Sequence, residues 1–104
     1  MVSEETKRTL DVLKKLEETT GRPFSRQERF IDLVEEVGEL ANAMLAERGA
    51  KHEKRKKAEI DDSLCDILFN LIVLANDYGI DLKEAYHRML DELEERIRNG
   101  DFTD

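Results

Sequence analysis

The chain has 104 residues, and its 25 Asp and Glu residues outnumber its 17 Lys and Arg residues, which gives a formal net charge of −8. This length suits one domain with one modest hydrophobic core. The acidic charge argues against a stable nucleic-acid partner, because such a partner usually requires a basic surplus. The sequence holds no apolar run near the ~18 to 20 residues of a membrane span, and no apolar leader at its start. No membrane partner and a cytoplasmic location are therefore expected.

The composition favours an all-α fold. Strong helix formers dominate the sequence, which has one Pro, no Trp and 40% charged residues. The single cysteine excludes an intrachain disulfide. Because Cys65 lies in an apolar run, it is expected to be a buried thiol.

Four helices are expected within a single domain, 1–104, over residues 3–20, 25–48, 53–78 and 81–98. Ser25 and Glu28 fit the spacing of a capping box at the start of the second helix, and Asp81 and Glu84 fit it at the start of the fourth. Gly79 is expected to end the third helix in the left-handed conformation that glycine tolerates.

The third expected helix is the element around which the others pack. Between Leu64 and Ala75, only Asp66 and Asn70 are strongly polar, and a helix that is apolar nearly all round is normally buried. Short connections make neighbouring helices antiparallel, which predicts an antiparallel four-helix bundle. The third helix has more apolar faces than one bundle can cover, so the bundle is expected to be completed by dimerisation, as a homodimer or a homotetramer.

Acidic residues gather along one side of the second and third expected helices. At spacings of three and four they are Glu35, Glu36 and Glu39 on the second helix, and Glu59, Asp62 and Asp66 on the third. Such spacing places carboxylates on one helical face, and antiparallel packing can bring the two faces together. Burying bare carboxylates is costly, so either these faces meet water or a cation lies against them. Oxygen ligands alone favour Mg²⁺ or Mn²⁺ over Zn²⁺.

A basic segment precedes the third helix. Five of the seven residues from Lys51 to Lys57 are Lys or Arg. Either the segment is a solvated linker, or it is a flap that attracts phosphate next to the acidic residues.

The residues LVEEVGELA at 33–41, followed by an acidic segment that opens an apolar helix and then by GIDL at 79–82, resemble the MazG-like all-α nucleoside triphosphate pyrophosphohydrolases. The wider group includes the dimeric dUTPases. The family pattern is EExxE followed by ExxD, and Glu35, Glu36 and Glu39 match EExxE. The run DILFNLIVLANDYGIDL makes the resemblance more specific, and the resemblance covers roughly residues 25–98.

The ExxD half departs from the family pattern and leaves two registers open. Residues 59–62, EIDD, match ExxD literally. In the family, however, the final Asp directly precedes the apolar run. In this sequence that Asp is Asp66, and Ser63 then stands where the family has Glu. Asp62 is then expected to partner Asp66, with Glu59 as a third, outer carboxylate.

The resemblance implies a Mg²⁺-dependent enzyme, with Mn²⁺ as a substitute, that cleaves nucleoside triphosphates to a monophosphate and pyrophosphate in nucleotide-pool housekeeping. The implied metal ligands are Glu36, Glu39, Asp62 and Asp66. Glu35 or Glu59 would be catalytic by orienting or deprotonating the attacking water. The residues expected to bind substrate are Lys54, Arg55, Lys57, Asn70 and Arg96. Arg96 would come from the fourth helix or from a partner subunit, and Asn70 has a helix-to-helix hydrogen bond as its alternative role.

Two other functions fit the same sequence. One is a non-catalytic helical dimer, an interaction or regulatory module whose acidic faces are merely solvated. The other keeps the metal site but hydrolyses another phosphoanhydride.

Overall fold

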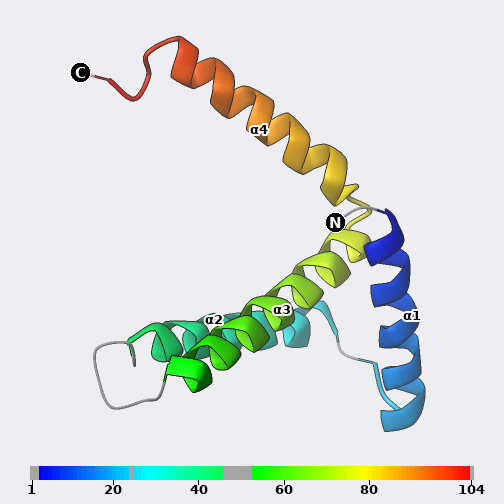
Figure 1. Ribbon diagram of the computed structural model, residues 1–104. Helices are drawn as coiled ribbons and strands as arrows, with labels where there is room; N and C mark the ends of the chain where they lie inside the picture. The colour runs from blue at the N-terminus through cyan, green and yellow to red at the C-terminus, as the bar shows by residue number, and fades with distance from the viewer. Residues whose placement is uncertain (1–2, 24, 46–52, 104) are drawn as a thin grey trace.

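The computed structural model describes residues 3–23, 25–45 and 53–103, leaving out the side chains of Ser3 and of residues 53–58. Its elements are α1 (Ser3–Thr20), α2 (Arg26–Leu45), α3 (Glu53–Asp77) and α4 (Leu82–Arg98), as Figure 1 shows. The regular elements among these described residues are all helices, with no strand, which confirms the all-α fold. The expected end of the second helix, at residue 48, lies outside the described residues.

Local hydrogen bonds explain where α2 and α4 begin and where α3 ends. The hydroxyl of Ser25 accepts from the backbone N–H of Glu28 at 3.1 Å, and the Glu28 carboxylate accepts from the N–H of Ser25 at 3.3 Å. Asp81 caps α4 by accepting from the N–H of Glu84 at 3.1 Å. Gly79 has a φ of +67°, which L side chains rarely adopt, so it ends α3 as the sequence predicts.

The main tertiary contact joins α2 and α3, which run antiparallel side by side, while α1 packs more lightly on α3 (Figure 1). The chain then bends by 102° between α3 and α4, so α4 stands apart from the other helices in Figure 1. A four-helix bundle is therefore not shown within one chain. No single described helix is long and apolar enough to cross a membrane. By length and composition alone, α3 and α4 pass the test together as one bent pair.

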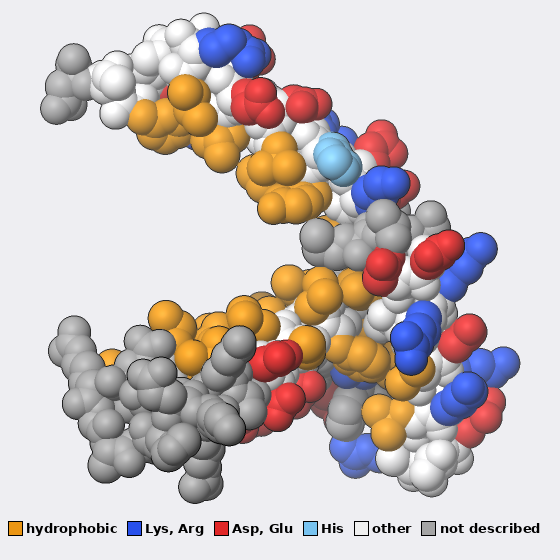
Figure 2. Space-filling view, viewed as in Figure 1, with side chains coloured by type: hydrophobic (Ala, Val, Ile, Leu, Met, Phe, Trp, Pro, Cys, Tyr) orange, Lys and Arg blue, Asp and Glu red, His pale blue; other side chains and the backbone are white. Residues whose placement is uncertain are grey.

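Much of the apolar surface of the described helices is uncovered. The fully buried apolar core consists of Ala43, Ile72 and Val73. The large exposed apolar side chains of α2 and α4 are Phe30, Ile31, Val34, Val37, Met44, Leu45, Tyr86, Met89, Leu93 and Ile97. Figure 2 shows that the apolar side of α4 faces an apolar side of the helix pair below it across open space.

Cys65 is exposed, so the expectation of a buried thiol is wrong. That expectation rested only on the apolar run in which Cys65 lies. In one chain, α1 and α2 leave this side of α3 open.

Candidate functional site

The antiparallel contact sets the polar residues of α2 and α3 opposite one another, one helical turn at a time. Asn70 of α3 donates from Nδ2 to Oδ2 of Asp32 on α2 at 3.0 Å. One turn further along both helices, Glu36 of α2 lies close enough to Asp66 of α3 for their charges to interact. Residues four apart lie on the same face of a helix, so one row of polar side chains follows each helix.

An open pocket of about 400 Å³ lies between the two helices beyond the Glu36–Asp66 pair. Its lining residues are Glu39, Asn42, Ala43, Glu59, Asp62, Ser63 and Asp66. Carboxylates from both helices therefore open into one space.

The surroundings of Glu36 perturb its carboxylate. Its Oε2 is buried and has no hydrogen-bond partner among the described residues. Burial is the main cause that raises the pKa of Glu36 to about 7. The charges of Asp66, Glu39 and Asp32 add to it, as does a side-chain interaction with Glu39. A buried acceptor without a partner costs free energy, and a cation placed against these oxygens would remove the cost.

The carboxylate donors fit a hard divalent cation, although they do not complete its coordination by themselves. Among the described residues, no three His, Cys, Asp or Glu side chains are grouped closely enough to hold a metal ion by themselves. Mg²⁺ usually keeps several waters and binds through one or two carboxylates together with substrate phosphates. An incomplete ring of carboxylates beside the unpartnered Oε2 of Glu36 is compatible with such binding.

Both registers of the ExxD pattern fall in this pocket. Glu59 is half-buried, Ser63 is 6% exposed, and both line the pocket at a spacing of four residues on α3. Glu35 is exposed and is absent from the lining, so only one of the two candidate catalytic carboxylates, Glu59, opens into the pocket.

Asn70 is held between the helices. Its side chain is 2% exposed, its Oδ1 accepts from Nη1 of Arg29 at 3.1 Å, and its Nδ2 donates to Asp32. Of the two roles considered for Asn70, the structure shows the helix-to-helix hydrogen bond.

Of the basic candidates, Arg96 is the one whose side chain the structure describes, and it does not line the pocket. The side chains of Lys54, Arg55 and Lys57 lie outside the described residues. Arg96 is exposed on α4, where its Nε lies 3.4 Å from Oδ2 of Asp101. Because α4 stands apart in Figure 1, Arg96 would have to reach a pocket of another chain.

Two residues of the contact between α2 and α3, Arg29 and Asp32, were not predicted from the sequence. Asp32 precedes Glu36 by four residues, the same spacing that singled out the other acids, so this signal was present. Arg29 had no such signal, because arginine is usually exposed, whereas here it is 4% exposed.

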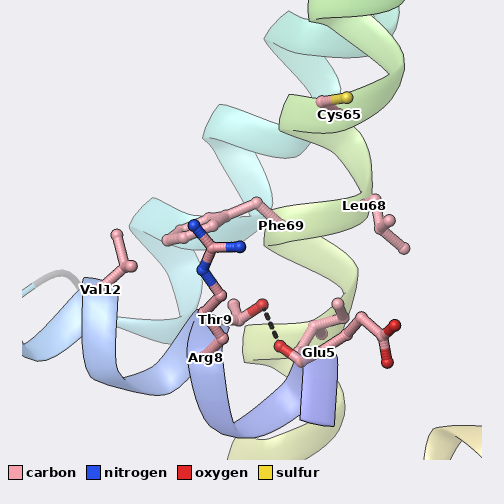
Figure 3. Close-up of a pocket in the computed structure, with 8 residues that line it drawn as sticks. Glu5, Arg8, Thr9, Val12, Cys65, Leu68 and Phe69 are labelled. Atoms are coloured by element: carbon pink, nitrogen blue, oxygen red, sulfur yellow. Dashed lines mark hydrogen bonds between the residues drawn. The ribbon is translucent and has the colours of Figure 1, made fainter. Parts of the chain in front are cut away.

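A second pocket, of about 270 Å³, lies between α1 and α3 (Figure 3). Its lining residues are Glu5, Arg8, Thr9, Val12, Cys65, Leu68, Phe69 and Ile72. The hydroxyl of Thr9 is turned back to the carbonyl of Glu5 in its own helix, at 2.6 Å. The lining is mostly apolar and includes none of the candidate metal ligands.

These helices and their shared acidic pocket define an all-α protein with a candidate site for a divalent cation. The chain matches the model of the MazG nucleotide pyrophosphohydrolase domain over residues 24–100, and it therefore belongs to that family. It is 38% identical over 81 residues to the uncharacterized protein YpjD of Bacillus subtilis (strain 168), over 73% of this chain and 70% of that protein. No solved structure matches the chain. The family resemblance is thus confirmed, and membership indicates an enzyme of the nucleotide pyrophosphohydrolase type.

Proposed function

We propose that this chain hydrolyses nucleoside triphosphates between the α and β phosphates, yielding a monophosphate and pyrophosphate, in cytoplasmic nucleotide-pool housekeeping. Family membership supports the reaction class. The observation that carries the proposal is the buried, unpartnered oxygen of Glu36, held among the acids of two helices beside an open acidic pocket. The oxygens of a solvated acidic face would contact water, whereas this oxygen is buried.

Glu36, Glu39, Asp62 and Asp66 would hold Mg²⁺, or Mn²⁺ in its place. The bound ion would neutralise phosphate charge and lower the pKa of a coordinated water. Glu59 opens into the same pocket, so it is better placed than Glu35 to orient or deprotonate the attacking water. These carboxylates repel one another most strongly when the site holds no cation, and a bound ion would relieve that repulsion.

A homodimer belongs to the same proposal. The apolar side of α4 has no cover among the described residues of its own chain (Figure 2). Exposed apolar surface of this extent on a small protein marks an interaction surface. A second copy would cover it with the apolar side of its own helices, in a two-fold arrangement. Arg96 of one chain, together with Lys54, Arg55 and Lys57, would then supply positive charge to the phosphates.

The test is an assay of a panel of nucleoside triphosphates with Mg²⁺ or Mn²⁺, in which pyrophosphate and the monophosphate are both measured. Glu39→Gln should lower kcat/KM by about a hundredfold or more, because a metal ligand is lost. Glu95→Gln, which neutralises an exposed glutamate on α4, should leave activity unchanged. Turnover of none of the triphosphates would contradict the proposal, and turnover of a dinucleotide instead would favour another phosphoanhydride as substrate.

A further inference from the structure

A buried polar network crosses from α2 to α3 next to the acidic pocket. Arg29 is 4% exposed and Asn70 is 2% exposed. Arg29 donates from Nη1 to Oδ1 of Asn70 at 3.1 Å, and its guanidinium lies 5.8 Å from the centre of the Phe69 ring. The amide nitrogen of Asn70 donates to Oδ2 of Asp32 at 3.0 Å and to the backbone oxygen of Asp66 at 3.1 Å. Both ends of the Asn70 amide are therefore held.

This network lies one helical turn from the acids that would bind a cation. Asp32 precedes Glu36 by four residues on α2, and Asn70 follows Asp66 by four residues on α3. Pairs at this spacing share a helical face, so the Asp32–Asn70 bond fixes the register in which Glu36 meets Asp66. Repulsion between the two acidic faces opposes that contact. A polar cross-link at this point would hold the two helices together against the repulsion.

The side chain of Asn70 is chemically suited to cross-link the two helices. An amide offers a donor and an acceptor at once, so Asn70 can bind the carboxylate of Asp32 and the guanidinium of Arg29 together. Arg29 brings a positive charge to one end of the amide, and the carboxylate of Asp32 accepts from the other end. A hydrophobic residue at position 70 would leave both charged groups without this partner.

We propose that Arg29, Asp32 and Asn70 are positioning residues that set the separation of Glu36 and Asp66 for a divalent cation. This inference rests on the proposed function, because it assumes that Glu36 and Asp66 bind the cation. Groups that orient metal ligands from behind typically change metal affinity by about 10- to 100-fold when they are removed.

The test exchanges donor and acceptor across the two helices. Asn70→Asp removes the amide donor and places a carboxylate opposite Asp32. The double variant Asp32→Asn with Asn70→Asp restores a donor–acceptor pair and keeps the parent's net charge. Mn²⁺ affinity is measured without substrate, from the electron paramagnetic resonance signal of free Mn²⁺. Asn70→Asp should weaken Mn²⁺ binding by about tenfold or more, and the double variant should recover most of that loss.

The direction in which Mn²⁺ affinity changes distinguishes an effect of positioning from an effect of charge. An added carboxylate that acted only through its charge would tighten Mn²⁺ binding, whereas lost positioning weakens it. Arg26→Gln is the matched control, because Arg26 also joins α2 to α3, through a bond from Nη2 to the backbone oxygen of Asp77 at 3.0 Å. Arg26 precedes Glu36 by ten residues, so this variant should lose stability and keep the parent's Mn²⁺ affinity.

Parental Mn²⁺ affinity in Asn70→Asp would overturn the proposal. So would a double variant that fails to fold or fails to recover binding, and this result decides the matter if Asn70→Asp alone does not fold. The proposed function fails separately: a parent that binds Mn²⁺ but releases no pyrophosphate contradicts the reaction, and the variants still decide the positioning. A parent that binds no Mn²⁺ contradicts both.

Discussion

Glu36 lies half-buried between α2 and α3, with one carboxylate oxygen that has no hydrogen-bond partner among the described residues. Burial and the neighbouring acids Asp66, Glu39 and Asp32 raise its pKa from the ordinary value of 4.5 to about 7. The folded chain therefore binds a proton at Glu36 more tightly than the unfolded chain does. Between these two values, stability falls as the pH rises, because the unfolded chain gives up its proton first.

Glu36→Gln removes this dependence, because glutamine does not titrate. Without metal, the variant should melt a few degrees above the parent at pH 8 and close to the parent at pH 4.5. Thermal melts of both proteins in the presence of a chelator, across this pH range, provide the measurement, and the difference between the two proteins isolates residue 36 from the other acids. A variant that melts below the parent at pH 8 would show that the Glu36 carboxylate is satisfied without a cation.

At the scale of the helices, Gly38 and Gly79, two of the three described glycines with room for a side chain, make a matched pair. An added Cβ at Gly79 or at Gly38 would meet no atom within 4 Å. Gly79 has a φ of +67° at the end of α3, whereas Gly38 lies within α2. The two positions therefore differ in backbone conformation and not in space.

Gly79→Ala should destabilise the protein by about 1 to 2 kcal/mol, because a residue with a Cβ is strained in the left-handed conformation. Gly38→Ala should stabilise it by about 0.5 to 1 kcal/mol, because alanine loses less conformational entropy in a helix. Denaturant unfolding of both variants checks the two signs. If both variants changed the free energy of unfolding in the same direction, the placement of Gly38 within α2 and of Gly79 at the end of α3 would be contradicted.

The helices and their caps could be predicted from the sequence, because they depend on residues close together in the chain. Ser25 and Glu28 form their capping box, and Gly79 takes its positive φ. The exposure of Cys65 and the burial of Arg29 could not be predicted, because each depends on which faces another helix covers. The direction of α4 has the same origin, since an amphipathic pattern identifies an apolar side but not its partner.

At the scale of the whole molecule, the uncovered apolar side of α4 determines the expected assembly. Leu93 lies on that side and Glu92 is its exposed neighbour. In a dimer, Leu93 would be buried against the second chain, whereas Glu92 would stay in water. A lysine at each position therefore probes the interface and a neighbouring surface site.

The parent should sediment at twice the 12.1 kDa mass of the chain. Leu93→Lys should weaken the dimer by about tenfold or more, because burying a lysine without a partner costs more than 1.4 kcal/mol. Glu92→Lys should leave the dimer intact. Analytical ultracentrifugation over a range of concentrations is the measurement, and a parent that sediments as a monomer throughout would refute the dimer.

The central claim is that carboxylates of α2 and α3 together hold a divalent cation, and thermal melting of the parent and of Glu39→Gln with and without Mg²⁺ tests it most directly. A ligand that binds only the folded state stabilises it by about 2.7 kcal/mol at a hundredfold excess over its Kd, which for a domain of this size is about 10 to 20 °C. Mg²⁺ should produce a shift of this size in the parent and a much smaller one in Glu39→Gln. Equal shifts in the two proteins, or no shift in the parent, would contradict the claim.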